Sequence, residues 1–166
     1  MKKNLVLTGM MGVGKSTIGK KLAKKLKLDF VDTDEIIESK EKSSIKNIFN
    51  KRGESYFRKL EKKVALQELK KSNLVVALGG GAFIDKVVRN EIKNSCLSFW
   101  LDLSIPSLLK RVKKTKKRPL LDLERLEESM IEIYSERKKI YNESNFRIKC
   151  DLLNKEEIVD KIIKLL

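Results

Sequence analysis

The stretch "GMMGVGKST", residues 9–17, constrains the fold of this chain more than any other feature. An apolar segment, residues 4–9, precedes it, and residues 15–26 carry apolar side chains at helical spacing. A buried strand, a glycine-rich turn and an amphipathic helix in this order predict a phosphate-binding loop. The pattern G-x-x-x-x-G-K-[ST] is met at Gly9, Gly14, Lys15 and Ser16.

Each residue type in this loop has a physical role. Glycines let successive backbone N–H groups turn inward as a nest for anions, and the following helix directs the positive end of its dipole at the phosphates. We expect Lys15 to contact the β- and γ-phosphates and Ser16 to ligate magnesium. The alternative is a glycine turn before a helix that merely begins with lysine. The motif predicts ATP with one Mg²⁺ ion, bound by Gly12, Val13, Gly14, Lys15, Ser16 and Thr17.

Strand-like and helix-like segments alternate along the chain, which predicts a parallel sheet covered by helices on both faces. The expected strands are residues 4–9, 30–34, 74–78, 97–103 and 146–150. The expected helices are residues 15–26, 43–49, 54–71, 84–93, 106–113, 126–141 and 156–166. In such sheets ligands bind at the carboxyl ends of the strands. A length of 166 residues and a hydrophobic content of 41% fit one domain, residues 1–166.

Composition excludes several classes of protein. No apolar run reaches about 18 residues, so neither a transmembrane helix nor a membrane partner is expected. The apolar part of the start "MKKNLVLTG" is too short for the core of a signal peptide. Cys96 and Cys150 do not have the spacing of metal ligands or of a disulfide framework. Both features favour a cytoplasmic protein. With no histidine in the chain, every mechanism that needs an imidazole base or ligand is excluded.

The net charge of +15 raises the question of a nucleic-acid partner. The excess comes mostly from lysines that are scattered over the predicted helices, which is typical of a solvated surface. The densest basic run, "KRVKKTKKR" at residues 110–118, has no interleaved aromatic residues on which bases could stack. We therefore expect no nucleic-acid partner, and an ATP-dependent nucleic-acid-binding protein remains the alternative from another class.

Other motifs narrow the class of P-loop protein. GTPases need Asn-Lys-x-Asp, and "NKEE" at residues 154–157 lacks the aspartate. Large ATPases need a strand-end acid, where "LVVALGGG", residues 74–81, has three glycines. In "FVDTDEI", Asp32 and Asp34 lie two apart at a strand end, so in an extended chain both carboxylates face the phosphate loop. One would hold magnesium through water and the other would orient or deprotonate an acceptor hydroxyl. The alternative is that either aspartate caps the following helix.

Three arginines are candidates for anion binding in a small kinase with an acceptor site and a closing lid. Arg58 follows a break at Gly53 and lies beside aromatic residues, an environment that suits a planar carboxylate. Arg118 lies in a basic loop from which a lid arginine would reach the ATP phosphates. Arg137 is one of several basic residues on its helix. Taken alone, Arg58 and Arg137 are each better explained as solvated surface charges.

Together these motifs resemble those of the shikimate kinase family over nearly the whole chain. The matching segments are the P-loop, "DTD" at 32–34, "IF…RGESYFRKLE" at 48–61, "GGGAF" at 79–83, "RPLL" at 118–121 and "ERKKIYNE" at 136–143. The resemblance implies the fold of nucleoside monophosphate kinases, a three-layer αβα domain with a five-stranded parallel sheet. It also implies an acceptor-binding helical region at about 33–61 and a lid at about 112–124. The implied reaction is phosphorylation of the 3-hydroxyl of shikimate by ATP in aromatic amino-acid biosynthesis.

The resemblance also implies roles for single residues in the acceptor site. Asp34 would bind ring hydroxyls and act as base or orienter, and Arg58 and Arg137 would clamp the shikimate carboxylate. The glycines would leave side-chain space empty, so that the ring can lie against the backbone at Gly80. The remaining contacts are expected from Phe49, Phe57, Gly79 and Gly81.

On the ATP side, the resemblance implies that Lys15 steadies the transferring phosphoryl group while Arg118 closes over the phosphates. Ser16 would ligate magnesium directly, and Asp32 would approach it through water. We expect a monomer whose partners are ATP, ADP and shikimate. The alternative within the same fold is a gluconate-type or nucleotide-type kinase, although no base-reading residues are evident.

Overall fold

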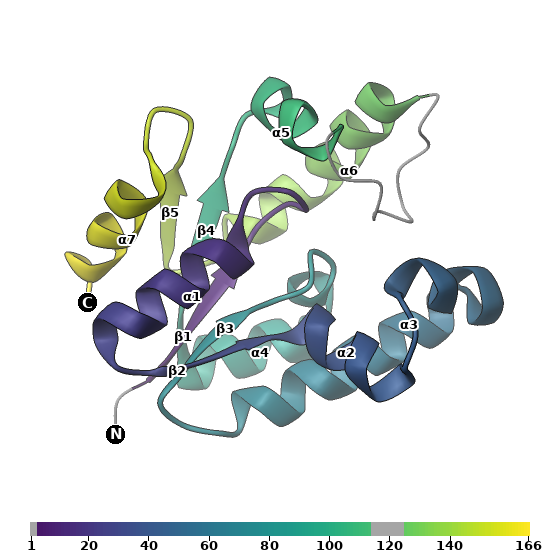
Figure 1. The fold of residues 1–166 in the computed structure, drawn as a ribbon, viewed down its shortest axis with the longest axis horizontal. Coiled ribbons are helices and arrows are strands. Elements are labelled where there is room, and N and C mark those ends of the chain that lie inside the picture. Colours follow the sequence, from purple (N-terminus) through teal and green to yellow (C-terminus); the bar gives the residue numbers. More distant parts are fainter. Residues whose placement is uncertain (1–2, 114–124) are drawn as a thin grey trace.

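A computed structural model describes residues 3–113 and 125–166 (Figure 1). Its centre is a five-stranded parallel sheet in the order β2-β3-β1-β4-β5. The strands are β1 (Asn4–Thr8), β2 (Asp29–Asp32), β3 (Leu74–Ala77), β4 (Cys96–Asp102) and β5 (Phe146–Lys149). The parallel sheet predicted from the alternating segments is confirmed, at nearly the expected positions.

Helices cover both faces of this sheet. Figure 1 shows α1 and α7 in front of the sheet and α4 behind it. The helices are α1 (Lys15–Leu26), α2 (Thr33–Glu41), α3 (Ile45–Leu69), α4 (Lys86–Ser95), α5 (Ile105–Val112), α6 (Leu126–Tyr141) and α7 (Lys155–Ile163), with a 3₁₀ turn η1 (Ala82–Ile84). The three-layer αβα architecture is confirmed. No helix in residues 3–113 and 125–166 has the length and apolar character that crossing a bilayer requires.

The central strands explain why the phosphate loop has a fixed platform. Leu5, Val6 and Leu7 of β1 pair with residues 75–77 of β3 on one side and residues 97–99 of β4 on the other. Every residue of β1 and β3 is buried, as expected of strands covered on both faces. The phosphate loop and the glycine turn therefore follow adjacent, rigid strands at the same edge of the sheet.

The expectation of an extended chain through Asp34 is wrong. Strand β2 ends at Asp32, and α2, which was not among the expected helices, begins at Thr33. Asp32 is the N-cap of α2: its Oδ1 accepts hydrogen bonds from the backbone N–H of Asp34 at 2.9 Å and of Glu35 at 3.4 Å. Capping satisfies two N–H groups that the helix start would otherwise leave unpaired, so the chain turns helical immediately after Asp32.

Helix α3 is interrupted at Gly53, as the sequence predicted. Gly53 has φ 80° and ψ 168°, outside the helical region, and separates the two helical parts of α3. A side chain there would meet no atom within 4 Å, so the positive φ is what favours glycine at this position. A small second core of Ile37, Ile48, Phe57 and Val64 packs α2 against α3. This packing fixes the helical region that carries Arg58.

Candidate active site

The ends of three neighbouring strands meet at one cavity. The P-loop follows β1, Asp32 ends β2, and the glycine turn follows β3. A cavity of about 210 Å³ lies between them. Its lining comprises Gly12, Gly14, Lys15, Ser16, Thr17, Asp32, Asp34 and Leu78. The structure thus brings both aspartates of "DTD" to the P-loop, although Asp34 reaches it from the first turn of α2.

The P-loop has the backbone geometry of an anion nest. Gly9, Gly12 and Gly14 have φ values of 128°, 81° and 102°, and Gly14 leads directly into α1. The Nζ atom of Lys15 donates to the carbonyl oxygens of Gly9 at 2.8 Å and Met10 at 3.1 Å. The ammonium group is therefore held against the loop, at the N-terminus of α1, where positive charge would meet bound phosphates.

Asp32 has two functions at once. While its Oδ1 caps α2, its Oδ2 accepts a short hydrogen bond from the Ser16 hydroxyl. Only 8% of Asp32 is exposed. A carboxylate and a hydroxyl paired beside a phosphate site offer the oxygen ligands that Mg²⁺ prefers. Capping of α2 by Asp32 is confirmed, and it leaves Oδ2 beside Ser16, whereas the contact of Asp32 with magnesium stays a prediction.

The glycine turn is crowded by charged side chains. A Cβ atom on Gly79 would lie 2.5 Å from Oδ1 of Asp34 and 2.5 Å from Oε1 of Glu61. On Gly81 it would lie 2.0 Å from Nη1 of Arg58. The expectation that these glycines leave their side-chain space empty is wrong at both positions. Gly80 differs, because its Cβ would meet no protein atom closer than 3.6 Å.

Thr33, the middle residue of "DTD", holds the glycine turn in place. The backbone N–H of Gly79 donates to Oγ1 of Thr33 at 2.8 Å, and Thr33 is fully buried. The same hydroxyl lies 3.4 Å from the carbonyl oxygen of Ala77, to which it donates. Sequence reasoning assigned Thr33 no role, since a threonine between two aspartates gives no local sign of a partner some 45 residues away.

Arg58 lies between two glutamates of its own helix. Its Nη1 donates to Oε2 of Glu61 at 2.7 Å, while Nε and Nη2 donate to Oε1 of Glu54 at 3.2 and 3.1 Å. Glu61 is buried, with 2% of the residue exposed. Burial alone lowers the pKa of Arg58, but attraction and hydrogen bonding from Glu61 and Glu54 raise this pKa above its ordinary value. The guanidinium is thus charged and held in a defined orientation.

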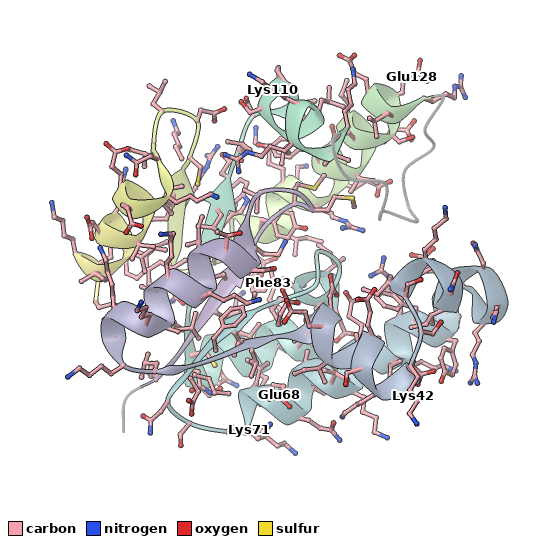
Figure 2. The ribbon with its side chains drawn as sticks, in the orientation of Figure 1. Lys42, Glu68, Lys71, Phe83, Lys110 and Glu128 are labelled. Atoms are coloured by element: carbon pink, nitrogen blue, oxygen red, sulfur yellow. The ribbon has the colours of Figure 1, made fainter. Side chains whose placement is uncertain are left out.

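Arg137 reaches the same glycine turn from α6. Its Nη1 donates to the carbonyl oxygen of Gly80 at 3.0 Å, and the Tyr141 hydroxyl donates to the same oxygen. The buried Tyr141 ring lies 6.4 Å from the Phe83 ring and 6.0 Å from the Trp100 ring, measured between centroids. Phe83 lies near the middle of the molecule in Figure 2. Aromatic packing therefore anchors the part of α6 that presents Arg137.

Arg58 and Arg137 line a common cavity. It has a volume of about 430 Å³, and Glu61 and Gly81 also contribute to its wall. The predicted wall residues Phe49 and Phe57 do not line it. Their rings contact each other, with centroids 4.6 Å apart, and lie 5.9 and 5.4 Å from the Arg58 guanidinium carbon. They pack beside Arg58, and a contact with substrate remains a prediction.

A third cavity, of about 510 Å³, lies on the other side of the P-loop. Arg111 of α5 lines it together with Gly14 and Ile18, and Leu153 and Asn154 close the opposite side. Nη1 of Arg111 donates to the carbonyl oxygen of Val13 at 2.8 Å. Sequence reasoning placed Arg111 within a basic run and assigned it no role. Its cavity position depends on a contact between residues 98 positions apart.

One predicted site residue cannot be placed, and two site residues were missed by the sequence analysis. Arg118 and residues 114–124 of the expected lid lie outside the described residues. Glu61 and Tyr141 were not predicted as site residues, although a signal was present in each case. Glu61 is three positions after Arg58, and Tyr141 is four after Arg137, spacings that place both partners on one helix face.

The chain is similar to known proteins over nearly its full length. A family model described as "Shikimate kinase" matches residues 11–166. A shikimate kinase from Sulfurihydrogenibium sp. (strain YO3AOP1) is 42% identical over 161 residues, 97% of this chain and 96% of that protein. The shikimate kinase of Bacillus subtilis (strain 168) is 41% identical over 166 residues, 99% of this chain and 89% of that protein.

Solved structures extend the comparison to the fold. Shikimate kinase from Acinetobacter baumannii in complex with shikimate superposes with a TM-score of 0.95 at 32% identity, covering 99% of this chain and 93% of that one. Deoxyadenosine kinase from M. mycoides superposes with a TM-score of 0.63 at 18% identity, covering 98% of this chain and 97% of that one. The second likeness concerns the fold alone.

Proposed function

The chain belongs to the shikimate kinase family, and from this premise we propose that it transfers the γ-phosphoryl group of ATP to the 3-hydroxyl of shikimate. The products are shikimate 3-phosphate and ADP, in aromatic amino-acid biosynthesis. The observation that carries the proposal is the placement of Arg58 and Arg137 at one glycine turn, with Asp34 on its P-loop side. A small acceptor with a carboxylate and several hydroxyls matches these groups.

The acceptor site is assigned to the helical region at about 33–61 and the glycine turn. Arg58 and Arg137 bind the substrate carboxylate, because a planar guanidinium pairs with a carboxylate through charge-assisted hydrogen bonds. Glu61 and Glu54 orient Arg58 before substrate arrives. Asp34 accepts a hydrogen bond from a ring hydroxyl, and the ring lies against the backbone at Gly80. Phe49, Phe57, Gly79 and Gly81 complete the surroundings.

Phosphoryl transfer itself needs position and positive charge more than covalent help from the protein. Lys15 and the P-loop N–H groups hold the phosphates of ATP. Asp34 orients or deprotonates the acceptor hydroxyl from the same cavity. Arg118 and the proposed lid at about 112–124 would close over the phosphates and exclude water, which limits wasteful hydrolysis of ATP.

One Mg²⁺ ion fits the donor groups at the P-loop. Ser16 supplies a hydroxyl and Asp32 a carboxylate, already hydrogen-bonded to each other beside the phosphate cavity. Ser16 would ligate the ion directly and Asp32 would hold it through water. When bound, the ion neutralises charge on the β- and γ-phosphates.

The 510 Å³ cavity is assigned to the base of ATP. Gly14 lines both this cavity and the cavity at the P-loop, so a nucleotide whose phosphates occupy the P-loop can place its base there. Arg111 provides a planar cation that can stack on an aromatic base. The residues assigned above are proposed to bind ATP and shikimate, and none of them is assigned to another ligand. We propose a cytoplasmic monomer without nucleic-acid or membrane partners.

A coupled assay tests this function directly. ADP release is followed with ATP, Mg²⁺ and one acceptor at a time: shikimate, gluconate, AMP or single-stranded DNA. We expect turnover with shikimate only. Turnover confined to gluconate or AMP would identify a different small-molecule kinase. ATP hydrolysis stimulated only by DNA would favour the nucleic-acid-binding alternative.

A further inference from the structure

The wall of the 510 Å³ cavity is built from two separate segments. One is α5, which supplies Arg111 and is tied to the P-loop through the carbonyl oxygen of Val13. The other is the segment between β5 and α7, from which Leu153 and Asn154 line the cavity. The distance between these segments sets the width of the cavity, so the contacts that join them bear on ligand binding.

Asp151 joins the two segments through its side chain. Its Oδ1 accepts hydrogen bonds from the hydroxyls of Ser104 at 2.5 Å and Ser107 at 3.0 Å. The backbone N–H of Ser104 donates to both carboxylate oxygens, each at 3.2 Å. Ser104 is the N-cap of α5. The Asp151 carboxylate therefore lies at the N-terminus of the helix that carries Arg111, where the helix dipole favours negative charge.

Within the described residues, residues 151–154 have few other contacts: Leu153 is partly buried and packs against the core, and its N–H donates to the carbonyl oxygen of Cys150 at 3.3 Å. Leu152 is 96% exposed, so it adds no apolar anchor. The backbone is tied at Cys150, whose N–H donates to the carbonyl oxygen of Asp102 at 2.8 Å. It is tied again at Asn154, which forms a capping box with Glu157. In the part of the chain that the structure describes, the side-chain hydrogen bonds that join residues 151–153 to the start of α5 all involve Asp151.

We propose that Asp151 is a positioning residue for the nucleotide, because it holds the segment that carries Leu153 and Asn154 at a fixed distance from Arg111. It acts through these residues and touches no reacting atom. The hydrogen bond from the Ser104 hydroxyl also lowers the pKa of the Asp151 carboxyl, because it favours the charged form. The inference rests on the proposed assignment of this cavity to the base of ATP.

This role differs from that of a helix cap that only stabilises the fold. A cap would affect thermal stability and leave nucleotide affinity unchanged in the folded protein. A positioning residue affects nucleotide affinity selectively, because the acceptor groups Arg58 and Arg137 lie on the other side of the P-loop, in a separate cavity. The two roles therefore predict different results for ADP and for shikimate.

The test compares Asp151→Ala, Asp151→Asn and Ser107→Ala with the unchanged protein. Asp160→Ala is the matched control, since it removes an exposed aspartate of α7 that accepts from Lys25 at 2.8 Å. ADP binding is measured by calorimetry, and KM for ATP and for shikimate by the coupled assay. For Asp151→Ala we expect the ADP dissociation constant and KM for ATP to rise about five- to tenfold, the scale of one or two lost hydrogen bonds. KM for shikimate and kcat should change less than about twofold.

The remaining variants decide the outcome. Asp151→Asn keeps an acceptor oxygen for both serines, so its ADP affinity should stay close to that of the unchanged protein. In Ser107→Ala the ADP affinity should fall about two- to threefold. This variant also allows the proposal to be tested if Asp151→Ala does not fold. Unchanged ADP affinity in both Asp151→Ala and Ser107→Ala would overturn the proposal, whatever their melting temperatures. An equal rise in the KM values of both substrates would also overturn it. ADP binding needs no turnover, so a chain that binds ADP but does not phosphorylate shikimate would contradict the proposed function alone.

Discussion

Nη1 of Arg58 donates to Oε2 of the buried Glu61 over 2.7 Å, three positions along the same helix. A second buried glutamate of α3, Glu68, forms a matching i,i+3 pair with Lys71 just beyond the helix end, over 2.6 Å. Figure 2 shows Glu68 and Lys71 side by side. The two pairs share chemistry but differ in place, because only the first lines the acceptor cavity. The Glu68–Lys71 pair therefore serves as a control for the effect of Glu61 on Arg58.

Arg58→Ala is expected to raise the shikimate KM by about a hundredfold or more, since losing a charge-assisted pair costs about 2–4 kcal/mol. KM for ATP should change little. Steady-state kinetics with each substrate varied in turn measures both values. Arg52→Ala is the control, because Arg52 is exposed and its guanidinium carbon lies 4.7 Å from the centroid of the Tyr56 ring. An unchanged shikimate KM in Arg58→Ala would show that the carboxylate binds elsewhere.

Glu61→Gln is expected to raise the shikimate KM by about tenfold, because Arg58 would lose the buried charge that orients it. Glu68→Gln removes the matching buried charge away from the cavity. It should leave the shikimate KM within about twofold of the original value. The assay is repeated beside thermal unfolding of both variants, which separates loss of stability from loss of orientation. Equal KM changes in the two variants would contradict a positioning role for Glu61.

Asp34→Asn is expected to lower kcat by at least about a hundredfold while ADP affinity changes little, because the carboxylate acts on the acceptor hydroxyl. Single-turnover kinetics and calorimetric titration with ADP measure the two quantities separately. Asp29→Asn provides the control, as Asp29 is an exposed aspartate at the start of β2. If kcat and ADP affinity fell in parallel in Asp34→Asn, its assignment to the acceptor would be refuted.

The glycine turn gives a prediction that separates two neighbouring positions. Gly81→Ala must displace Arg58, since the new Cβ would lie 2.0 Å from Nη1, and the shikimate KM should rise at least about tenfold. Gly80→Ala meets protein atoms no closer than 3.6 Å, so its unfolding temperature should not change. We expect it nevertheless to weaken shikimate binding, because the ring is proposed to lie against Gly80. Unaltered shikimate affinity in Gly80→Ala would remove that contact from the site.

The two buried cysteines give a prediction on pH. Burial raises the pKa of Cys150 from 9.0 to about 12 and also raises that of Cys96. At pH 8 neither thiol should react with a thiol reagent in the native protein, whereas both should react in denaturant. Because the pKa of Cys150 is higher in the folded protein, its contribution to the free energy of unfolding is fully present below pH 9. This contribution is lost as the pH rises from 9 towards 12. Rapid modification of the native protein at pH 8 would contradict this burial.

Short-range patterns were sufficient for much of the fold. The strand, turn and helix of the P-loop occupy consecutive residues, so Lys15 and Ser16 could be placed from spacing alone. The break at Gly53 was likewise visible, because a glycine between two helical segments is a local signal. The error at Asp34 has a local cause as well. Capping by Asp32 and continued extension compete for the same residues, and capping prevailed.

The sequence by itself determined the P-loop, the parallel sheet and the residue types available for the site, because each depends on neighbours a few positions apart. Only the tertiary structure decided which groups meet. Arg137 reaches Gly80 across 57 positions and Arg111 reaches Val13 across 98. No local pattern encodes such contacts, since they depend on the order of the strands and the packing of helices on the sheet. The same packing places the Arg58 guanidinium directly against Gly81, where the sequence had predicted empty space.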